Sequence, residues 1–181
     1  MKKSILIVFA SVVAGLGSTA SAEDPYQIAW KTQIGTSGFD YSFSVDVDPS
    51  GNAYISGSTT GDLGGTNAGF YDAFLSKFDS GGNELWTTQL GTGVHDNSES
   101  IAVDASGNAY ISGSTTGDLG GLNSGGYDAF LSKFDSDGNE LWTTQIGTRV
   151  GDNSHSIAVD ASGNAYISGS TAGDLGGLNS G

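Results

Sequence analysis

The two histidines are the first candidates for catalytic chemistry, because imidazole is the commonest general base in enzymes. His95 and His155 occupy different positions within a repeated unit that is described below. At the equivalent position of the neighbouring copy, His95 is matched by Gly151, and His155 is matched by Glu99. No Ser-His-Asp set therefore has a repeated geometry behind it, and the chain has no cysteine for thiol catalysis. We predict no enzymatic activity and no catalytic residue.

Two acidic stretches resemble the start of a calcium-binding loop, in which closely spaced oxygen ligands precede a glycine. They are residues 135–139 (DSDGN) and 46–51 (DVDPSG). Neither is followed by the bidentate glutamate at the twelfth position, and their acidic pairs do not recur: Ala102 corresponds to Asp46, and Gly81 to Asp137. Hairpin-turn chemistry explains the same residues. We predict no bound metal and no cofactor.

A second acidic set would be better placed for ligand binding. Asp96 and Asp118 lie one in each of two long loops and are repeated as Asp152 and Asp174. Asx-type capping within glycine-rich connections accounts for all four residues without a ligand, and this structural interpretation is favoured.

These residues sit on a chain with a sequence period of 56 residues. Trp30, Trp86 and Trp142 mark the period, and residues 86–125 match residues 142–181 at 35 of 40 positions. A period of this size is typical of a repeat architecture.

Within one period the pattern predicts strands. In residues 128–135 (DAFLSKFD), Phe130 and Phe134 fall on one face and Leu131 on the other. Turns of the Asp-x-x-Gly-Asn type separate such segments, and two more strands complete the period. The 30 glycines and 2 prolines suit an all-β chain with tight turns. Four antiparallel strands per repeat predict a β-propeller blade.

Residues 128–142 (DAFLSKFDSDGNELW) and 157–169 (IAVDASGNAYISG) resemble the bacterial SBBP-type β-propeller repeat, and the resemblance covers nearly all of the chain after residue 22. It implies propeller blades in an exported bacterial protein and carries over no catalytic or binding residue. Residues 135–142 are also similar to the tryptophan-docking motif of quinoprotein propellers, which would imply a quinone-dependent dehydrogenase. Packing of a tryptophan between blades explains that motif without a cofactor.

The first 22 residues have the pattern of a secretory signal peptide. Lys2 and Lys3 precede an apolar stretch, and the segment ends in Ala20-Ser21-Ala22. We expect cleavage, no membrane insertion afterwards, and a secreted or periplasmic protein. The remainder carries 20 acidic and four basic side chains, a net charge of −16, which disfavours nucleic acid as a partner.

Residues 23–181 are predicted to form the propeller repeats. They comprise an orphan fourth strand at 27–34, units at 42–90 and 98–146, and a partial unit at 154–181. These amount to about 2.8 units, fewer than the four or more blades of closed propellers, so they predict an open arc. The orphan strand would complete the last blade of a ring. Closure would come from further repeats of a longer protein, which we favour, or from self-association.

The loops supply the functional expectation. Tight turns lie at one end of each blade, whereas long loops, residues 91–98 and 116–127, lie at the other. Three of the five differences between the last two copies, Gly93/Arg149, His95/Gly151 and Glu99/His155, fall in or beside one of these loops. We predict a non-enzymatic exported scaffold that presents these loops to a protein, glycan or cation. A sugar-binding propeller is the alternative, with aromatic residues at Phe39, Tyr41, Phe70 and Tyr71.

Overall fold

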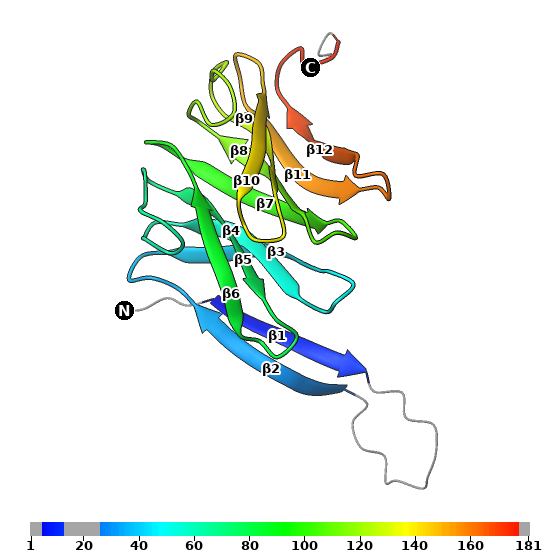
Figure 1. The fold of residues 1–181 in the computed structure, drawn as a ribbon. Helices are drawn as coiled ribbons and strands as arrows, with labels where there is room; N and C mark the ends of the chain where they lie inside the picture. The colour runs from blue at the N-terminus through cyan, green and yellow to red at the C-terminus, as the bar shows by residue number, and fades with distance from the viewer. Residues whose placement is uncertain (1–4, 13–25, 178–181) are drawn as a thin grey trace, which may run out of the picture.

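The computed structural model describes residues 5–12 and 26–177, which contain twelve β-strands and no helix (Figure 1). None of the described residues therefore forms a helix that could span a membrane. The strands are β1 (Ile5–Val12), β2 (Tyr26–Ile34), β3 (Asp40–Val47), β4 (Ala53–Thr59), β5 (Asp72–Phe78), β6 (Glu84–Leu90), β7 (Asp96–Val103), β8 (Ala109–Thr115), β9 (Asp128–Phe134), β10 (Glu140–Ile146), β11 (Asp152–Val159) and β12 (Ala165–Thr171).

The strands form two complete blades and two strand pairs. Strands β3-β4-β5-β6 make blade A and β7-β8-β9-β10 make blade B, each a four-stranded antiparallel sheet in sequence order. The pair β11-β12 follows blade B, and the pair β1-β2 precedes blade A (Figure 1). The predicted all-β arc of four-stranded blades is confirmed. The first strands begin two residues before the predicted unit starts, at Asp40, Asp96 and Asp152.

Strand β2 packs against blade A in the same way that the fourth strand of blade A packs against blade B. Trp30 and Ile34 pack on Phe74 and Phe78, just as Trp86 and its neighbours pack on the phenylalanines of blade B. The structure also gives β2 a partner that the sequence did not predict, because β1 pairs with it antiparallel. Strand β1 lies inside the predicted signal peptide. Cleavage of the signal peptide stays a prediction, and the expected cleavage position after Ala22 lies outside the described residues.

The main hydrophobic core lies between blades A and B. Phe130 and Phe134 of β9 point into it, while Leu131 belongs to the core toward β11, so the predicted alternation is confirmed. The indole of Trp86, which belongs to blade A, reaches blade B. There its Nε1 donates a hydrogen bond to the carbonyl of Ser136 at 3.2 Å. The tryptophan therefore acts as the inter-blade packing device that the sequence favoured over a cofactor contact.

The tight turns are built around an aspartate that accepts hydrogen bonds from its own turn. In the turn after β9, Asp135 accepts from the backbone N–H of Asp137 at 3.0 Å and of Asn139 at 2.9 Å, and from the Asn139 amide at 2.9 Å. Gly138 adopts the positive φ of 86° that closes the turn. Hairpin chemistry thus occupies the carboxylate of the first calcium-like stretch, as predicted.

These turn aspartates make stability depend on acid pH. Hydrogen bonds from Asn139 lower the pKa of Asp135; at Asp104, burial raises the pKa, but hydrogen bonds from Asn108 and Ser106 outweigh it and leave the pKa lowered. A lowered folded-state pKa contributes stability above the unfolded value of about 3.9, and that contribution is lost as the pH falls through the folded pKa.

We therefore expect the thermal midpoint of the 181-residue chain to fall between about pH 5 and about pH 3. Asp104→Asn should be less stable than the wild type near neutral pH, and the difference should shrink as the pH falls below about 5 and through the lowered pKa of the folded Asp104 carboxyl. Thermal unfolding followed by circular dichroism measures both. A difference that stays constant across this pH range would contradict the assignment.

Candidate binding surface along the first strands

A β-bulge interrupts the first strand of every unit at the same position. The pairing register shifts between Ser42 and Ser44, between Ser98 and Ser100, and between Ser154 and Ser156. The residue left between each pair of serines is Phe43, Glu99 or His155. Bulges bend a strand and redirect a side chain, so one structural position carries an aromatic, an acidic and an imidazole side chain in the three copies.

A glycine on the second strand allows each bulge. Gly57, Gly113 and Gly169 lie opposite Ser42, Ser98 and Ser154. A Cβ atom at Gly113 would overlap the carbonyl oxygen of Asn97, and the other two glycines face the matching carbonyls of Tyr41 and Asn153 in the same way. Only a residue without a side chain lets the first strand approach this closely.

The first strands of neighbouring units lie side by side, because β3 contacts β7 and β7 contacts β11. Side chains of β3 hold β7 in place: Ser44 Oγ accepts a hydrogen bond from the N–H of Ile101 at 3.2 Å, and Asp46 Oδ2 accepts from that of Val103 at 2.7 Å. Asp46, the first residue of the second calcium-like stretch, therefore links two blades. The sequence did not predict this role, since it requires the neighbouring strand.

The bulge residues of β7 and β11 contact one another. His155 Nδ1 lies 2.7 Å from Glu99 Oε2, and His155 Nε2 lies 3.2 Å from Ser170 Oγ. The pair is solvent-accessible, with side-chain exposures of 53% for His155 and 34% for Glu99, so its contribution to stability is small. Beside it, Phe43, Asn97 and Glu99 line an open hollow of about 390 Å³.

The contact between Ser170, His155 and Glu99 could not be predicted from the sequence. Its order of nucleophile, base and carboxylate is that of a hydrolytic triad, although all three side chains are open to water. Sequence comparison identified the Glu99/His155 difference but placed it beside a long loop. The structure places both residues inside strands β7 and β11.

An aromatic row continues from the bulge of β3 to the long loops. Ring centroids of Phe39, Tyr41 and Phe43 follow one another at 6.3 and 6.2 Å, and Tyr71 lies 6.4 Å from Tyr41. His95 joins them, 5.7 Å from Tyr71 and stacked on a further aromatic ring, that of Phe70, at 5.1 Å. The structure thus gathers the four aromatic residues predicted for a sugar-binding propeller and adds Phe43 and His95.

The predicted acidic set braces loops. Asp96 is fully buried and accepts hydrogen bonds from the backbone N–H of Thr92 at 2.6 Å, from the Thr92 hydroxyl at 2.8 Å and from the Thr115 hydroxyl. Burial raises the pKa of its carboxyl, and these bonds offset part of that rise. Asp118 accepts from the N–H of Asn123 at 2.8 Å, and Asp152 repeats the Asp96 pattern with Thr148. These three carboxylates therefore brace their own loops, through bonds to residues four or five positions away and not through Asx turns, and Asp96 and Asp152 lie at the starts of strands.

The longer loop of each blade is also braced from within. Gln145 Oε1 accepts from the N–H groups of Leu119 at 3.0 Å and Gly120 at 3.2 Å, while its Nε2 donates to the carbonyl of Gly117 and to Asp128, both at 3.0 Å. Gln89 makes the same contacts in blade A. The long loops therefore present a preformed surface. Within the described ranges, no three His, Cys, Asp or Glu side chains are grouped to hold a metal ion.

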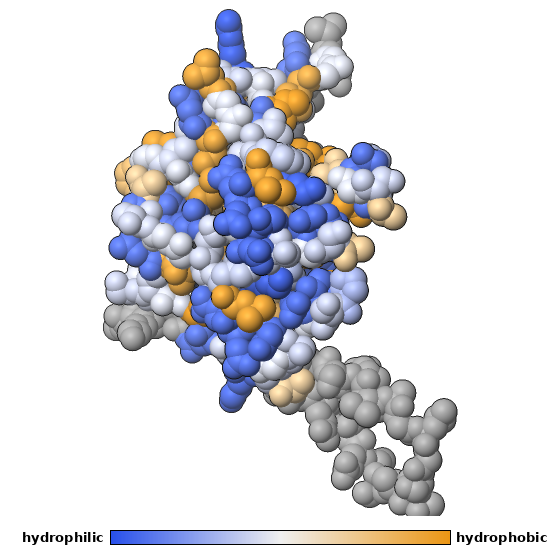
Figure 2. All heavy atoms as spheres, viewed as in Figure 1, coloured by the Kyte–Doolittle hydropathy of each residue, from blue (hydrophilic) through white to orange (hydrophobic). Residues whose placement is uncertain are grey.

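Apolar side chains on the face seen in Figure 2 form small separate patches among hydrophilic ones. That distribution agrees with a formal net charge of −14 for the whole chain.

Four-stranded antiparallel blades repeated in series, with a tryptophan between neighbours, define an open β-propeller. The family described as "SBBP: Beta-propeller repeat" matches residues 29–64, 85–120 and 141–176, and the chain belongs to this family.

The proteins similar to the chain include one relative and one solved structure. The chain is 30% identical over 113 residues to the regulatory protein FlaEY of Caulobacter vibrioides (strain ATCC 19089 / CIP 103742 / CB 15), an alignment that covers 58% of this chain and 12% of that protein. A crystal structure of a protein of unknown function from Bacteroides caccae aligns at 14% identity with a TM-score of 0.45, over 80% of this chain and 43% of that one. The chain therefore spans less than half the length of either relative.

Proposed function

We propose that the chain is a non-enzymatic, exported binding module whose ligand contacts the first strands and the adjoining long loops. One observation carries the proposal: the bulge position holds Phe43, Glu99 and His155 in three copies, whereas β4, β8 and β12 share the sequence AYISGST. A constant scaffold with variable, solvent-facing side chains is the usual arrangement of a recognition surface. The ligand is a protein or a glycan.

The aromatic row supports a glycan as the second candidate ligand. Rings that are partly open to water, with Asn97, Glu99 and His155 beside them, combine a stacking surface with hydrogen-bonding groups. Tyr41 lies at the centre of the row, since it contacts Phe39, Phe43 and Tyr71. Tyr41 is therefore the residue whose removal tests both candidates.

We expect the 181-residue chain to select ligands from a glycan array or from a displayed random-peptide library. Tyr41→Ala should weaken the binding of a selected ligand about tenfold or more, because aromatic side chains that a ligand covers supply most of the binding energy of such contacts. The matched control is Leu85→Ala, which removes an exposed side chain from the outer strand β6 and should leave the affinity unchanged. Titration calorimetry measures the affinities.

Which library yields the ligand decides between the two candidates. Ligands that bind Tyr41→Ala as well as they bind the wild type, or a lack of ligands in both libraries, would contradict the proposed surface. The non-enzymatic part has its own test in the Ser170–His155–Glu99 contact. Turnover of an activated ester by the wild type that disappears in Ser170→Ala would overturn it.

A further inference from the structure

The hollow between β3 and β7 contains hydrogen-bonding groups that the described part of the chain leaves unused. Phe43 of β3 lines it together with Asn97 and Glu99 of β7, so it lies between the two complete blades. Glu99 Oε2 contacts His155, but Glu99 Oε1 has no hydrogen-bond partner among the described residues. The side-chain amide of Asn97 has none there either. Two polar groups beside an open space are therefore available to a ligand.

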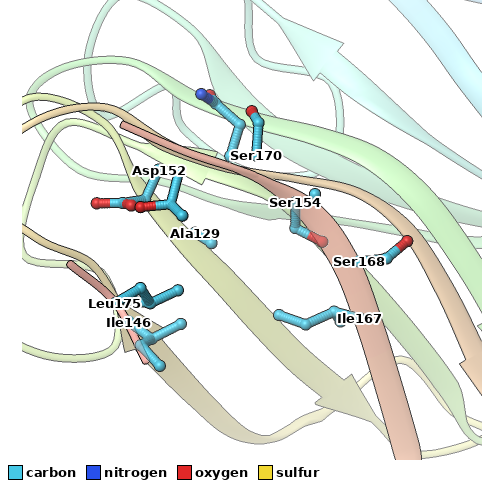
Figure 3. A pocket seen from close by; sticks show the side chains of 11 residues that line it. Ala129, Ile146, Asp152, Ser154, Ile167, Ser168, Ser170 and Leu175 are labelled. Carbon is cyan, nitrogen blue, oxygen red and sulfur yellow. The ribbon is translucent and has the colours of Figure 1, made fainter. Parts of the chain in front are cut away.

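A side chain of the next unit holds the Glu99 carboxylate in position. His155 Nδ1 lies 2.7 Å from Glu99 Oε2, and the other ring nitrogen, Nε2, lies 3.2 Å from Ser170 Oγ. Figure 3 shows the Ser170 hydroxyl directed away from the apolar side chains of Ile146 and Leu175 in the pocket beside β12. The imidazole is thus fixed at both nitrogens. It occupies one oxygen of the carboxylate and leaves the other for a ligand.

The groups around the hollow suit a planar cation. The face of the Phe43 ring attracts positive charge, and the oxygens of Glu99 and Asn97 accept hydrogen bonds. A guanidinium stacks on aromatic rings and carries its N–H donors in one plane, whereas the ammonium of lysine is a strongly hydrated point charge. No basic side chain is among the described residues that line the hollow. Arginine is therefore the side chain that matches these three groups best.

The charge of the chain also favours a basic partner. The sequence has 20 acidic and six basic side chains, so a positively charged segment would be attracted from a distance. The chain itself pairs cations with aromatic rings, since Lys77 Nζ lies 5.0 Å from the centroid of the Tyr54 ring. Lys133 Nζ lies 4.7 Å from that of Tyr110. The Phe43 ring has no such cation printed on it by the fold and is open to one from outside.

The spacing of the aromatic row indicates the conformation of the bound segment. The ring centroids of Phe39, Tyr41 and Phe43 follow one another at 6.3 and 6.2 Å. Alternate side chains of an extended strand are about 6.6 Å apart, which is close to that spacing. An extended segment with one side chain in the hollow would therefore place every second residue over Tyr41 and Phe39.

We propose that the hollow binds an arginine side chain of an extended partner-protein segment whose alternate side chains pack on the aromatic row. The guanidinium stacks on Phe43, donates hydrogen bonds to Glu99 Oε1 and to the amide oxygen of Asn97, and neutralises the carboxylate. This inference rests on the proposed ligand surface and assigns its ligand to the protein class. It also gives Glu99, at the bulge of β7, the role of selecting the ligand by charge.

We expect a fluorescent peptide of sequence Leu-Ser-Leu-Ser-Arg-Ser-Leu-Ser-Leu to bind the 181-residue chain saturably, as measured by anisotropy. The sequence reads the same in both directions, so either orientation presents the same alternate side chains to the row. Citrulline in place of the arginine keeps the shape of the side chain but removes its charge, and it should weaken binding about tenfold or more. Tyr41→Ala should weaken the binding of both peptides.

Glu99→Gln should weaken the binding of the arginine peptide about tenfold and leave that of the citrulline peptide nearly unchanged. This difference measures the contact between the arginine and Glu99 by itself. The matched control is Glu84→Gln, which removes the same charge from an exposed position on β6 where Thr87 Oγ1 donates to Glu84 Oε1 at 2.7 Å. It should change neither affinity, so it separates a local contact from the net charge of the chain.

The outcomes separate this ligand from others. Absence of saturable binding, equal affinities for the two peptides, or equal effects of Glu99→Gln and Glu84→Gln would overturn the arginine assignment. A glycan that binds the wild type and loses affinity in Tyr41→Ala, while the arginine peptide does not bind, would overturn it and leave the proposed surface in place. A concentration-dependent dimer in light scattering that dissociates in both Glu99→Gln and Arg149→Gln would assign the hollow to a second copy of the chain.

Discussion

Phe130→Ala is expected to lower the free energy of unfolding by about 3–5 kcal/mol, the range for removing a fully buried phenylalanine ring. The side chain of Phe130 has no exposed surface and lies in the core shared by the two complete blades. Its loss would open a cavity among Leu90, Ile111 and Leu119, which belong to three different strands or loops that cannot all collapse inward. Urea unfolding monitored by tryptophan fluorescence measures the change.

The control for this substitution is Leu122→Ala, which removes a side chain that is 85% exposed and should change stability by no more than about 0.5 kcal/mol. A loss at Phe130 below about 1 kcal/mol would mean that the two blades are not packed through this ring.

Gly113→Ala is expected to cost about 3 kcal/mol or more, although it adds a single methyl group. The new Cβ would overlap the carbonyl oxygen of Asn97. That oxygen belongs to the backbone, so it cannot move aside as the end of a flexible side chain could. Relief requires the first strand to move away, which would also displace Glu99 at the bulge. Urea unfolding gives the energy, and amide chemical shifts of residues 97–100 report the displacement.

Gly93→Ala is the matched control, since a Cβ at Gly93 would meet no atom within 4 Å. It should be neutral within about 0.5 kcal/mol. Equal effects of the two substitutions would show that backbone entropy alone decides the cost, and that close strand approach at the bulge does not.

The repeat-to-repeat differences gain a different meaning in three dimensions. Three of the five substitutions between the last two copies were expected in or beside one long loop, and two of them involve the positions of His95 and Glu99. The structure places His95 in the aromatic cluster with Tyr71 and Glu99 at a bulge in contact with His155. Both lie along the row of first strands, which joins the loop variation and the aromatic residues into one surface.

Local chemistry made much of the fold predictable. Alternation of side chains identified the strand faces, so Phe130 and Leu131 were assigned to opposite sides correctly. The aspartate, glycine and asparagine of each tight turn bond within five residues of chain, and such short-range contacts leave a signature in sequence. The spacing of the tryptophans was sufficient to show that the units repeat.

The bulges were not predictable in this way. Ser98-Glu99-Ser100 has the alternation of an ordinary strand, and nothing within it shows that Glu99 lacks a partner. A bulge is a relation between two strands, here between Ser98 and Gly113, and it depends on how closely their backbones approach. The contacts from Ser44 and Asp46 to β7 likewise cross from one unit to the next.

The sequence alone thus determined the repeat, the strands, the tight turns and the class of fold, because each arises from contacts between residues close along the chain. Tertiary structure alone decided two other features: the bulge surface and the aromatic cluster around Tyr41. Each of these joins residues from different strands or different units. Their distances are set by how the blades pack against one another, and no local pattern records that packing.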